Sequence, residues 1–354
     1  MEVVVEDTET NKLIDPIVKG KLKPFVRKID TEAYYAEEFL KDLGKSGLLD
    51  SNDLDKNELL VREMQLIEET SKTCMTTGFN LWCHLASLTY LRNSNVDYLK
   101  KELLPSLEKG EFLGGTGLSN PMKYFADLEP LHLKAERIKG GYTISGNLPS
   151  VSNLKHDHWF GVIALNNNKE IIAFVPCNTN GLTLKEKANY IGVNGSATYA
   201  CKFDSVFIPD DWIISSDAKT FVDNVRSTFV LYQIPLGLGV ITASVQSMKK
   251  APNKQGGVNK FLSIQPEEIE HEYLLLKRRI TMLLERNELK TDWKEILQIR
   301  LDVDKLTIKA VHGDMLHYGG AAYLQKSNPS RRLREAYFLL NLTPTEKHLE
   351  KLLS

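Results

Sequence analysis

The sequence predicts an α+β protein of three successive regions: an N-terminal helical domain over 1–109, a central antiparallel β-sheet or β-barrel domain over 110–213, and a C-terminal four-helix-bundle domain over 214–354. Two observations lead to this prediction. Apolar residues recur at helical spacing in the first and third regions and alternate in the second. The strands of the middle region also follow one another through tight turns, without helical crossovers, which is typical of an antiparallel sheet.

The N-terminal region contains three helical patterns. Asp30, followed by Thr31 and Glu32, has the composition of a helix start, and the apolar spacing continues to Leu48. Two further patterns cover 59–91 and 96–111.

Turn residues separate the strands predicted in the central region. A Gly-Gly turn divides two alternating stretches within 134–147, and a polar turn at 166–169 divides two strongly apolar strands within 159–176. A further strand is predicted within 197–209. After it, helical patterns cover 219–250, 266–288, 292–325 and 330–342, and the turn-rich segment 251–260 is expected to be a loop.

Composition narrows the range of functions. The formal net charge is −1 at pH 7 and no basic stripe is present, which argues against nucleic acid as a partner. The acidic N-terminus lacks the features of a secretion signal, and the longest uncharged apolar run, 229–245, contains Gln233 and Pro235 and is expected to be a buried helix rather than a membrane span. The four cysteines form no CxxC pair, so we expect reduced thiols and a cytoplasmic protein.

Local motifs for other chemistries are weak. His156, Asp157 and His158 could ligate a metal, but no third ligand cluster is evident, so a surface turn is favoured and no metal site is predicted. The glycines of 114–117 lack the GxGxxG spacing, and the chain has no GxSxG motif.

One carboxylate near the C-terminus has two interpretations. Thr343, Pro344 and Glu346 have the spacing of a capping box, with Thr343 as N-cap, Pro344 at N1 and Glu346 at N3. A structural role for Glu346 is therefore favoured over a catalytic one.

With this architecture in place, the sequence resembles the acyl-CoA dehydrogenase family of flavoproteins over nearly its whole length. The stretch GVNGSATYACKFDSVFIPDDW (192–212) is similar to the end of that family's β domain. LPSLEKGEFLGGTGLSNP (104–121), IPLGLGVITASVQSM (234–248) and YGGAAY (318–323) resemble further family elements in the same order.

The resemblance implies FAD, with its ring between the β domain and the C-terminal bundle. Leu118 and Ser119, followed by Asn120, match the strand that contacts the pyrimidine side of the flavin. Ser152 matches a threonine that approaches flavin N5, where a hydroxyl donor can stabilise charge on the reduced ring.

Several departures weaken these expectations. The family's loop after this strand is replaced by MKYFADLE (122–129), its stacking Trp by Ser150, and its pyrophosphate-contacting segment by VNKFLSI (258–264). FAD remains the expected cofactor, with FMN or no flavin as alternatives. The family's catalytic Glu corresponds to Thr343, which leaves Glu346 as a candidate displaced base.

The leading functional prediction is a flavin-dependent dehydrogenase that acts on an acyl-CoA or another small apolar substrate, with an unknown electron acceptor. One alternative is a monooxygenase that uses reduced flavin on the same fold, and another is a non-catalytic homologue that binds an acyl or flavin ligand. His84, Tyr124 and Phe125 are predicted to line the substrate pocket. The resemblance further implies a homodimer or homotetramer.

Overall fold

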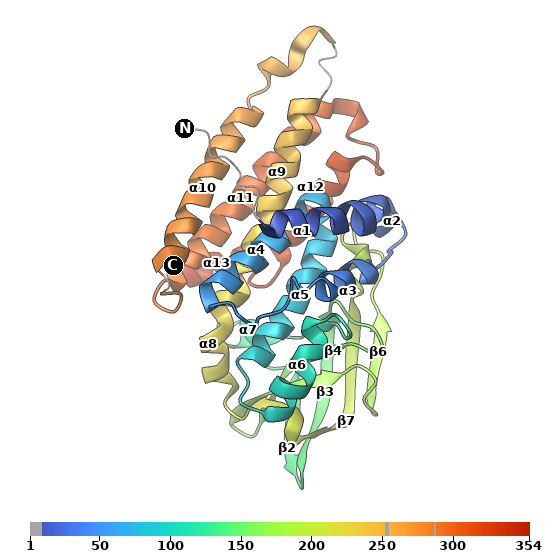
Figure 1. Ribbon diagram of the computed structural model, residues 1–354, viewed down its shortest axis with the longest axis vertical. Helices are drawn as coiled ribbons and strands as arrows, with labels where there is room; N and C mark the ends of the chain where they lie inside the picture. The colour runs from blue at the N-terminus through green and yellow to red at the C-terminus, as the bar shows by residue number, and fades with distance from the viewer. Residues whose placement is uncertain (1–8, 252–254, 287) are drawn as a thin grey trace.

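The computed structural model describes residues 9–251, 255–286 and 288–354. Within them, helices precede and follow a single sheet, in the order that the sequence predicts (Figure 1). The exact domain boundaries, at 109/110 and 213/214, remain a prediction.

The N-terminal region is mainly helical, with connecting segments at 32–36, 46–55 and 93–97. Its helices are α1 (Glu9–Ile17), η1 (Val18–Leu22), η2 (Lys23–Phe25), α2 (Val26–Thr31), α3 (Glu37–Lys45), α4 (Lys56–Thr73), α5 (Met75–Arg92), η3 (Tyr98–Leu103) and α6 (Leu104–Glu108). The predicted helix start at Asp30 is wrong, because α2 ends at Thr31 and Ala33 has a positive φ of 53°. The pattern 59–91 is divided at Cys74, whose φ of −156° and ψ of 108° are extended.

The central region forms one curled sheet. Its strands are β1 (Gly114–Thr116), β2 (Leu133–Ile138), β3 (Gly141–Val151), β4 (Trp159–Asn166), β5 (Lys169–Pro176), β6 (Leu182–Glu186), β7 (Tyr199–Pro209) and β8 (Ile213–Ser215). The strand order is β6-β7-β3-β2-β4-β5-β8, with β1 beside β4. Both predicted hairpins, β2–β3 and β4–β5, are confirmed. The sheet is not purely antiparallel, however, since β1 and β2 each pair with β4 in parallel.

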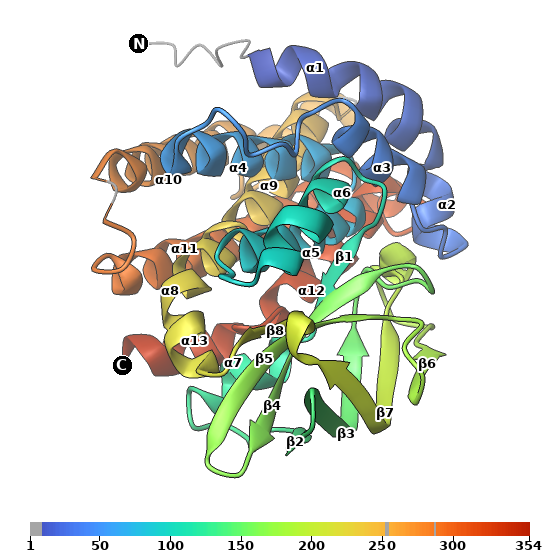
Figure 2. The same ribbon diagram turned by 60° about the horizontal axis from the view of Figure 1, so that its bottom comes forward.

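The strongly apolar sequence of β4 is explained by burial on both faces. Trp159 and Ile163 belong to the large core shared with the helices, whereas Phe160 and Val162 belong to a second core inside the curled sheet. Figure 2 shows the sheet as a separate layer against the helices, with α5 close above it.

The C-terminal region is a bundle of long helices. They are α8 (Ala218–Leu231), α9 (Ile234–Lys250), η6 (Gln255–Phe261), α10 (Pro266–Arg286), α11 (Trp293–Tyr318), η7 (Gly319–Ala321), α12 (Asn328–Asn341) and α13 (Glu346–Leu353). The predicted loop at 251–260 falls partly on 252–254, which lie outside the described residues, and its second half is the 3-10 helix η6. The stretch Ala218–Lys250 is long and apolar enough to cross a membrane, but 83% of its most apolar window is buried inside the fold, as in a core helix.

Candidate functional site

A cavity of about 390 Å³ lies where the three regions meet. Helix α5, the segment from β1 to the short helix α7 (Ser119–Tyr124), the end of β3 and the loop before β7 form part of its wall, and α8 and the end of α12 complete it. No single region could enclose this space, so the site depends on how the regions pack together. Its volume is within the range of small-molecule and cofactor sites.

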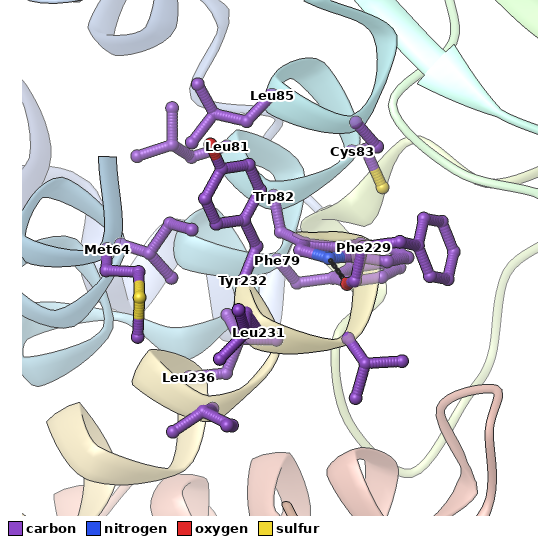
Figure 3. Close-up of a cluster of buried hydrophobic side chains, with 14 of the residues drawn as sticks. Met64, Phe79, Leu81, Trp82, Cys83, Leu85, Phe229, Leu231, Tyr232 and Leu236 are labelled. Atoms are coloured by element: carbon purple, nitrogen blue, oxygen red, sulfur yellow. Dashed lines mark hydrogen bonds between the residues drawn. The ribbon is translucent and has the colours of Figure 1, made fainter. Parts of the chain in front are cut away.

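One wall of the cavity is aromatic. Phe79 stacks on Trp82 with 5.6 Å between ring centroids, and the edges of Phe229 and Phe338 pack against this pair. The indole nitrogen of Trp82 donates to the carbonyl of Phe229 at 3.1 Å, as the dashed line in Figure 3 marks. This bond fixes the position of the Trp82 ring, so the wall presents a preorganised flat, apolar surface to a ligand.

The cavity lining is also rich in aliphatic hydroxyl groups. These are Thr116, Ser119, Ser150, Ser152, Ser196, Thr198 and Thr343. Ser119 and Thr343 share a hydrogen bond of 2.8 Å between their hydroxyls, and Thr198 bonds at 2.7 Å to both Ser152 and Ser196. Hydroxyls can both donate and accept hydrogen bonds, so these groups can bind the polar edge of a neutral ligand.

No carboxylate, imidazole, ammonium or guanidinium group is found among the described residues that line the cavity. The one thiol there, Cys83, is buried, and burial raises its pKa well above the ordinary value. Serine and threonine hydroxyls do not ionise usefully near neutral pH. The cavity therefore offers binding groups but no general base of its own.

The comparisons with known proteins agree on one family, although no family model matches the chain. The chain is 22% identical over 366 aligned residues to the protein named probable acyl-CoA dehydrogenase YngJ of Bacillus subtilis (strain 168). This alignment covers 95% of this chain and 93% of that protein. Butyryl-CoA dehydrogenase from Megasphaera elsdenii superposes with a TM-score of 0.88 and 15% identity over 100% of this chain and 98% of that one. A glutaryl-CoA dehydrogenase from Mycobacterium smegmatis, solved in complex with FADH2, gives a TM-score of 0.77 and 16% identity over 97% and 93% of the two chains.

These relatives and structural neighbours confirm the resemblance of the chain to the acyl-CoA dehydrogenase family. Its fold is that of the acyl-CoA dehydrogenases, as the sequence resemblance implies. Three of the positions that the resemblance singles out, Ser119, Ser152 and Thr343, line the same cavity although they come from separate parts of the chain. Leu118 directly precedes Ser119, and its side chain is buried in the large core.

Asn120 has a structural position outside the lining of the cavity. Its amide nitrogen donates to Glu129 at 2.8 Å and to the carbonyl of Pro130 at 2.9 Å, and its oxygen accepts from the backbone nitrogen of His132. These three bonds fix the loop that departs from the family pattern. Contact of Asn120 with a cofactor stays a prediction.

The three residues predicted to line a substrate pocket lie elsewhere. His84 is fully buried within α5, where Nε2 donates to the carbonyl of Leu107 and Nδ1 accepts from the backbone nitrogen of Gly114. Tyr124 donates its hydroxyl to Glu170 at 2.8 Å, and its ring packs on Phe125 rather than over the cavity. His84 is thus a bridge between helix and sheet, and none of the three lines this cavity, so their pocket role stays a prediction.

Glu346 is neither a cap at N3 nor a cavity residue. Helix α13 begins at Glu346 itself, and its N-cap, Thr345, makes no side-chain capping bond. The capping box fails because the hydroxyl of Thr343 bonds to Ser119 and its carbonyl accepts from Gln233. Burial raises the pKa of the Asp304 carboxyl to about 6, and the negative charge of Glu346 contributes to this rise.

The sequence reasoning missed the aromatic wall. Phe79 and Trp82 are three residues apart, so they share one face of α5, a spacing that could have identified them. Phe229 and Phe338 lie on helices distant in sequence, and only packing brings them to this pair.

Proposed function

We propose that this chain is a flavin-dependent oxidoreductase that dehydrogenates an acyl-CoA or a related acyl thioester at the cavity of α5, the β-sheet region and α12. The proposal rests mainly on the joint position of Ser119, Ser152 and Thr343 around one flat, apolar space. Similarity to the family supports it, because relatives over much of the chain are named as acyl-CoA dehydrogenases.

The cavity fits the ring of a flavin better than its phosphates. Flat aromatic walls suit a tricyclic ring, and the hydroxyls of Ser119 and Ser152 suit its polar edge. No lysine or arginine of the described chain lines the cavity, so the phosphates of FAD or FMN would have to lie outside it. When bound, the flavin would supply the acceptor for two electrons.

The residues of this chain would then act by binding and orientation. The aromatic wall would exclude water from the reacting end of the substrate, which strengthens every polar contact made there. The paired hydroxyls of Ser119 and Thr343 would hold a thioester or ring oxygen without transferring a proton. Removal of an α-proton would need a base from outside the lining, and Glu346 does not line it.

This lack of a base favours the second candidate, a monooxygenase that uses reduced flavin, because that chemistry needs no α-proton abstraction. It also favours the third, a homologue that binds an acyl or flavin ligand without turning it over. We further propose a homodimer or homotetramer and a cytoplasmic location. A mass near 40 kDa in light scattering, that of the monomer, would contradict the oligomer.

The test is an anaerobic absorption titration of the flavin-loaded protein with short, medium and long acyl-CoAs. Bleaching of the flavin band would support the dehydrogenase. Ser152→Ala should then weaken flavin retention more than Ser145→Ala. Ser145 is a control on β3, the strand that ends directly before Ser152; its hydroxyl accepts from the Ser205 nitrogen and lies outside the cavity lining. A bound flavin that no acyl-CoA bleaches would favour the monooxygenase, and failure to retain flavin would favour the binding protein.

A further inference from the structure

A second cluster of functional groups lies where α3 meets the turn between β3 and β4. Glu37 comes from the first turn of α3, and Asp157 and His158 come from the turn before β4. One carboxylate oxygen of each acid and one ring nitrogen of His158 all lie within 4.8 Å of one another. Glu37 supplies the third group that the local sequence around His158 lacks.

The hydrogen bonds of His158 determine which ring nitrogen faces the acids. Its Nδ1 lies 3.0 Å from the carbonyl oxygen of Asn153, and because a carbonyl can only accept, Nδ1 carries the proton. The Nε2 atom is completely buried and has no hydrogen-bond partner among the described residues. Metal-binding histidines usually have this arrangement, with the second nitrogen held by a backbone carbonyl.

The distances favour a metal ion over a proton between these groups. Nε2 lies 3.7 Å from Oε1 of Glu37 and 3.9 Å from Oδ1 of Asp157. Both separations exceed the roughly 2.7–3.2 Å of an N–H···O hydrogen bond. A cation bonded at about 2.1 Å to each atom would place tetrahedral ligands about 3.4 Å apart, so the two distances from Nε2 would each shorten by roughly 0.3–0.5 Å.

We propose that Glu37, Asp157 and His158 form a binding site for a first-row divalent metal ion such as Zn²⁺, with water completing the coordination. One imidazole and two carboxylates form a donor set suited to such ions. The Asp157 side chain is 50% exposed, so an ion can enter from solvent. The bound ion would join α3 to the turn that follows β3, close to Ser152 of the cavity.

Two lysines set a limit on the affinity of this site. Lys41 lies 2.8 Å from Oε1 of Glu37, and Lys155 pairs with Oε2 of the same carboxylate. Both ammonium groups repel a metal ion and compete with it for Glu37. Removing one of them should therefore strengthen metal binding, an effect opposite to that of removing a ligand.

The test is a titration of the chelator-treated full-length protein with CoCl₂ and ZnCl₂ at neutral pH. We expect a visible cobalt absorption band that saturates at one equivalent and is displaced by zinc, together with a rise in melting temperature. His158→Gln should abolish both signals, the more exposed Asp157→Asn should weaken them, and Lys155→Met should tighten binding severalfold. His156→Gln, a neighbouring exposed histidine outside the cluster, is the matched control and should change nothing.

Absence of saturable binding to the wild-type protein would overturn the proposal, as would binding that persists in both His158→Gln and Asp157→Asn. Equal loss in His156→Gln would assign the metal to surface histidines and would also overturn it. None of these readouts involves flavin, so the result is independent of the proposed function.

Discussion

Replacement of His84 tests whether this residue supports the fold or the chemistry. Its Nε2 bonds to the carbonyl of Leu107 at 3.2 Å and its Nδ1 to the backbone nitrogen of Gly114 at 3.0 Å, so one ring joins α5 to the end of α6 and to β1. His84→Leu keeps much of the side-chain volume but removes both partners. His84→Asn keeps an acceptor near the Nδ1 position, and His84→Gln keeps a donor near the Nε2 position.

The size of the effect follows from the partners that the two backbone groups keep. The carbonyl of Leu107 also accepts from the backbone nitrogen of Gly110 at 3.0 Å, so His84→Leu leaves mainly the buried backbone nitrogen of Gly114 without a partner. This should lower the free energy of unfolding by about 1–3 kcal/mol. His84→Asn, which keeps an acceptor for the Gly114 nitrogen, should lose less stability than His84→Gln, which keeps only the donor to Leu107.

The pH dependence gives a second readout. Burial lowers the pKa of His84 to about 3, so the folded protein keeps this ring neutral while the unfolded chain takes up a proton below its ordinary value near 6.5. The unfolded state then binds more protons, and stability is lost as the pH falls from about 6.5 towards 3. In His84→Leu this contribution disappears, so the decline in stability with acid should be shallower.

The assay is urea unfolding followed by tryptophan fluorescence at several pH values between 4 and 7.5. Loss of less than about 1 kcal/mol in His84→Leu, or equal stability of all three variants, would refute the bridging role. A variant of normal stability with altered ligand binding would instead support the predicted pocket role of His84.

Three further outcomes are expected. Thr343→Glu should place a carboxylate in the cavity and raise any acyl-CoA-dependent flavin reduction, by about 10²–10⁴-fold if a missing base limits the rate; an unchanged rate would show that the base is not limiting. Arg92→Met should lower the free energy of unfolding by about 3–5 kcal/mol, because it leaves two buried carboxylates without their ion-pair partner. A stability equal to that of the wild type would refute this account. Gly44→Ala would bring a Cβ to 2.4 Å from the backbone nitrogen of Gly110 and should cost about 1–3 kcal/mol in thermal unfolding, whereas Gly20→Ala, with nothing within 4 Å, should cost less.

Local patterns in the sequence were reliable where neighbours along the chain decide the structure. The β2–β3 and β4–β5 hairpins follow from alternating strands with turn residues between them, and the long helices α10, α11 and α12 follow from apolar spacing. The capping box at Thr343 failed for the opposite reason, because Ser119, more than two hundred residues away in sequence, binds the hydroxyl that the cap requires.

The candidate sites show the same division. Ser119, Ser152 and Thr343 could be identified because a family resemblance relates them to a site, whereas Phe229 and Phe338 have no such motif and become wall residues only through helix packing. Histidine is a residue type common in functional sites, but the two backbone partners of His84 give it a structural role.

The sequence by itself determined the order of helices, sheet and helical bundle, because hydrophobic periodicity is a local property of the chain. The tertiary structure decided which polar groups meet: Thr343 with Ser119, and His158 with Glu37. Such pairs depend on long-range packing, in which each side chain's partner is set by the placement of whole helices and strands and not by its neighbours in sequence.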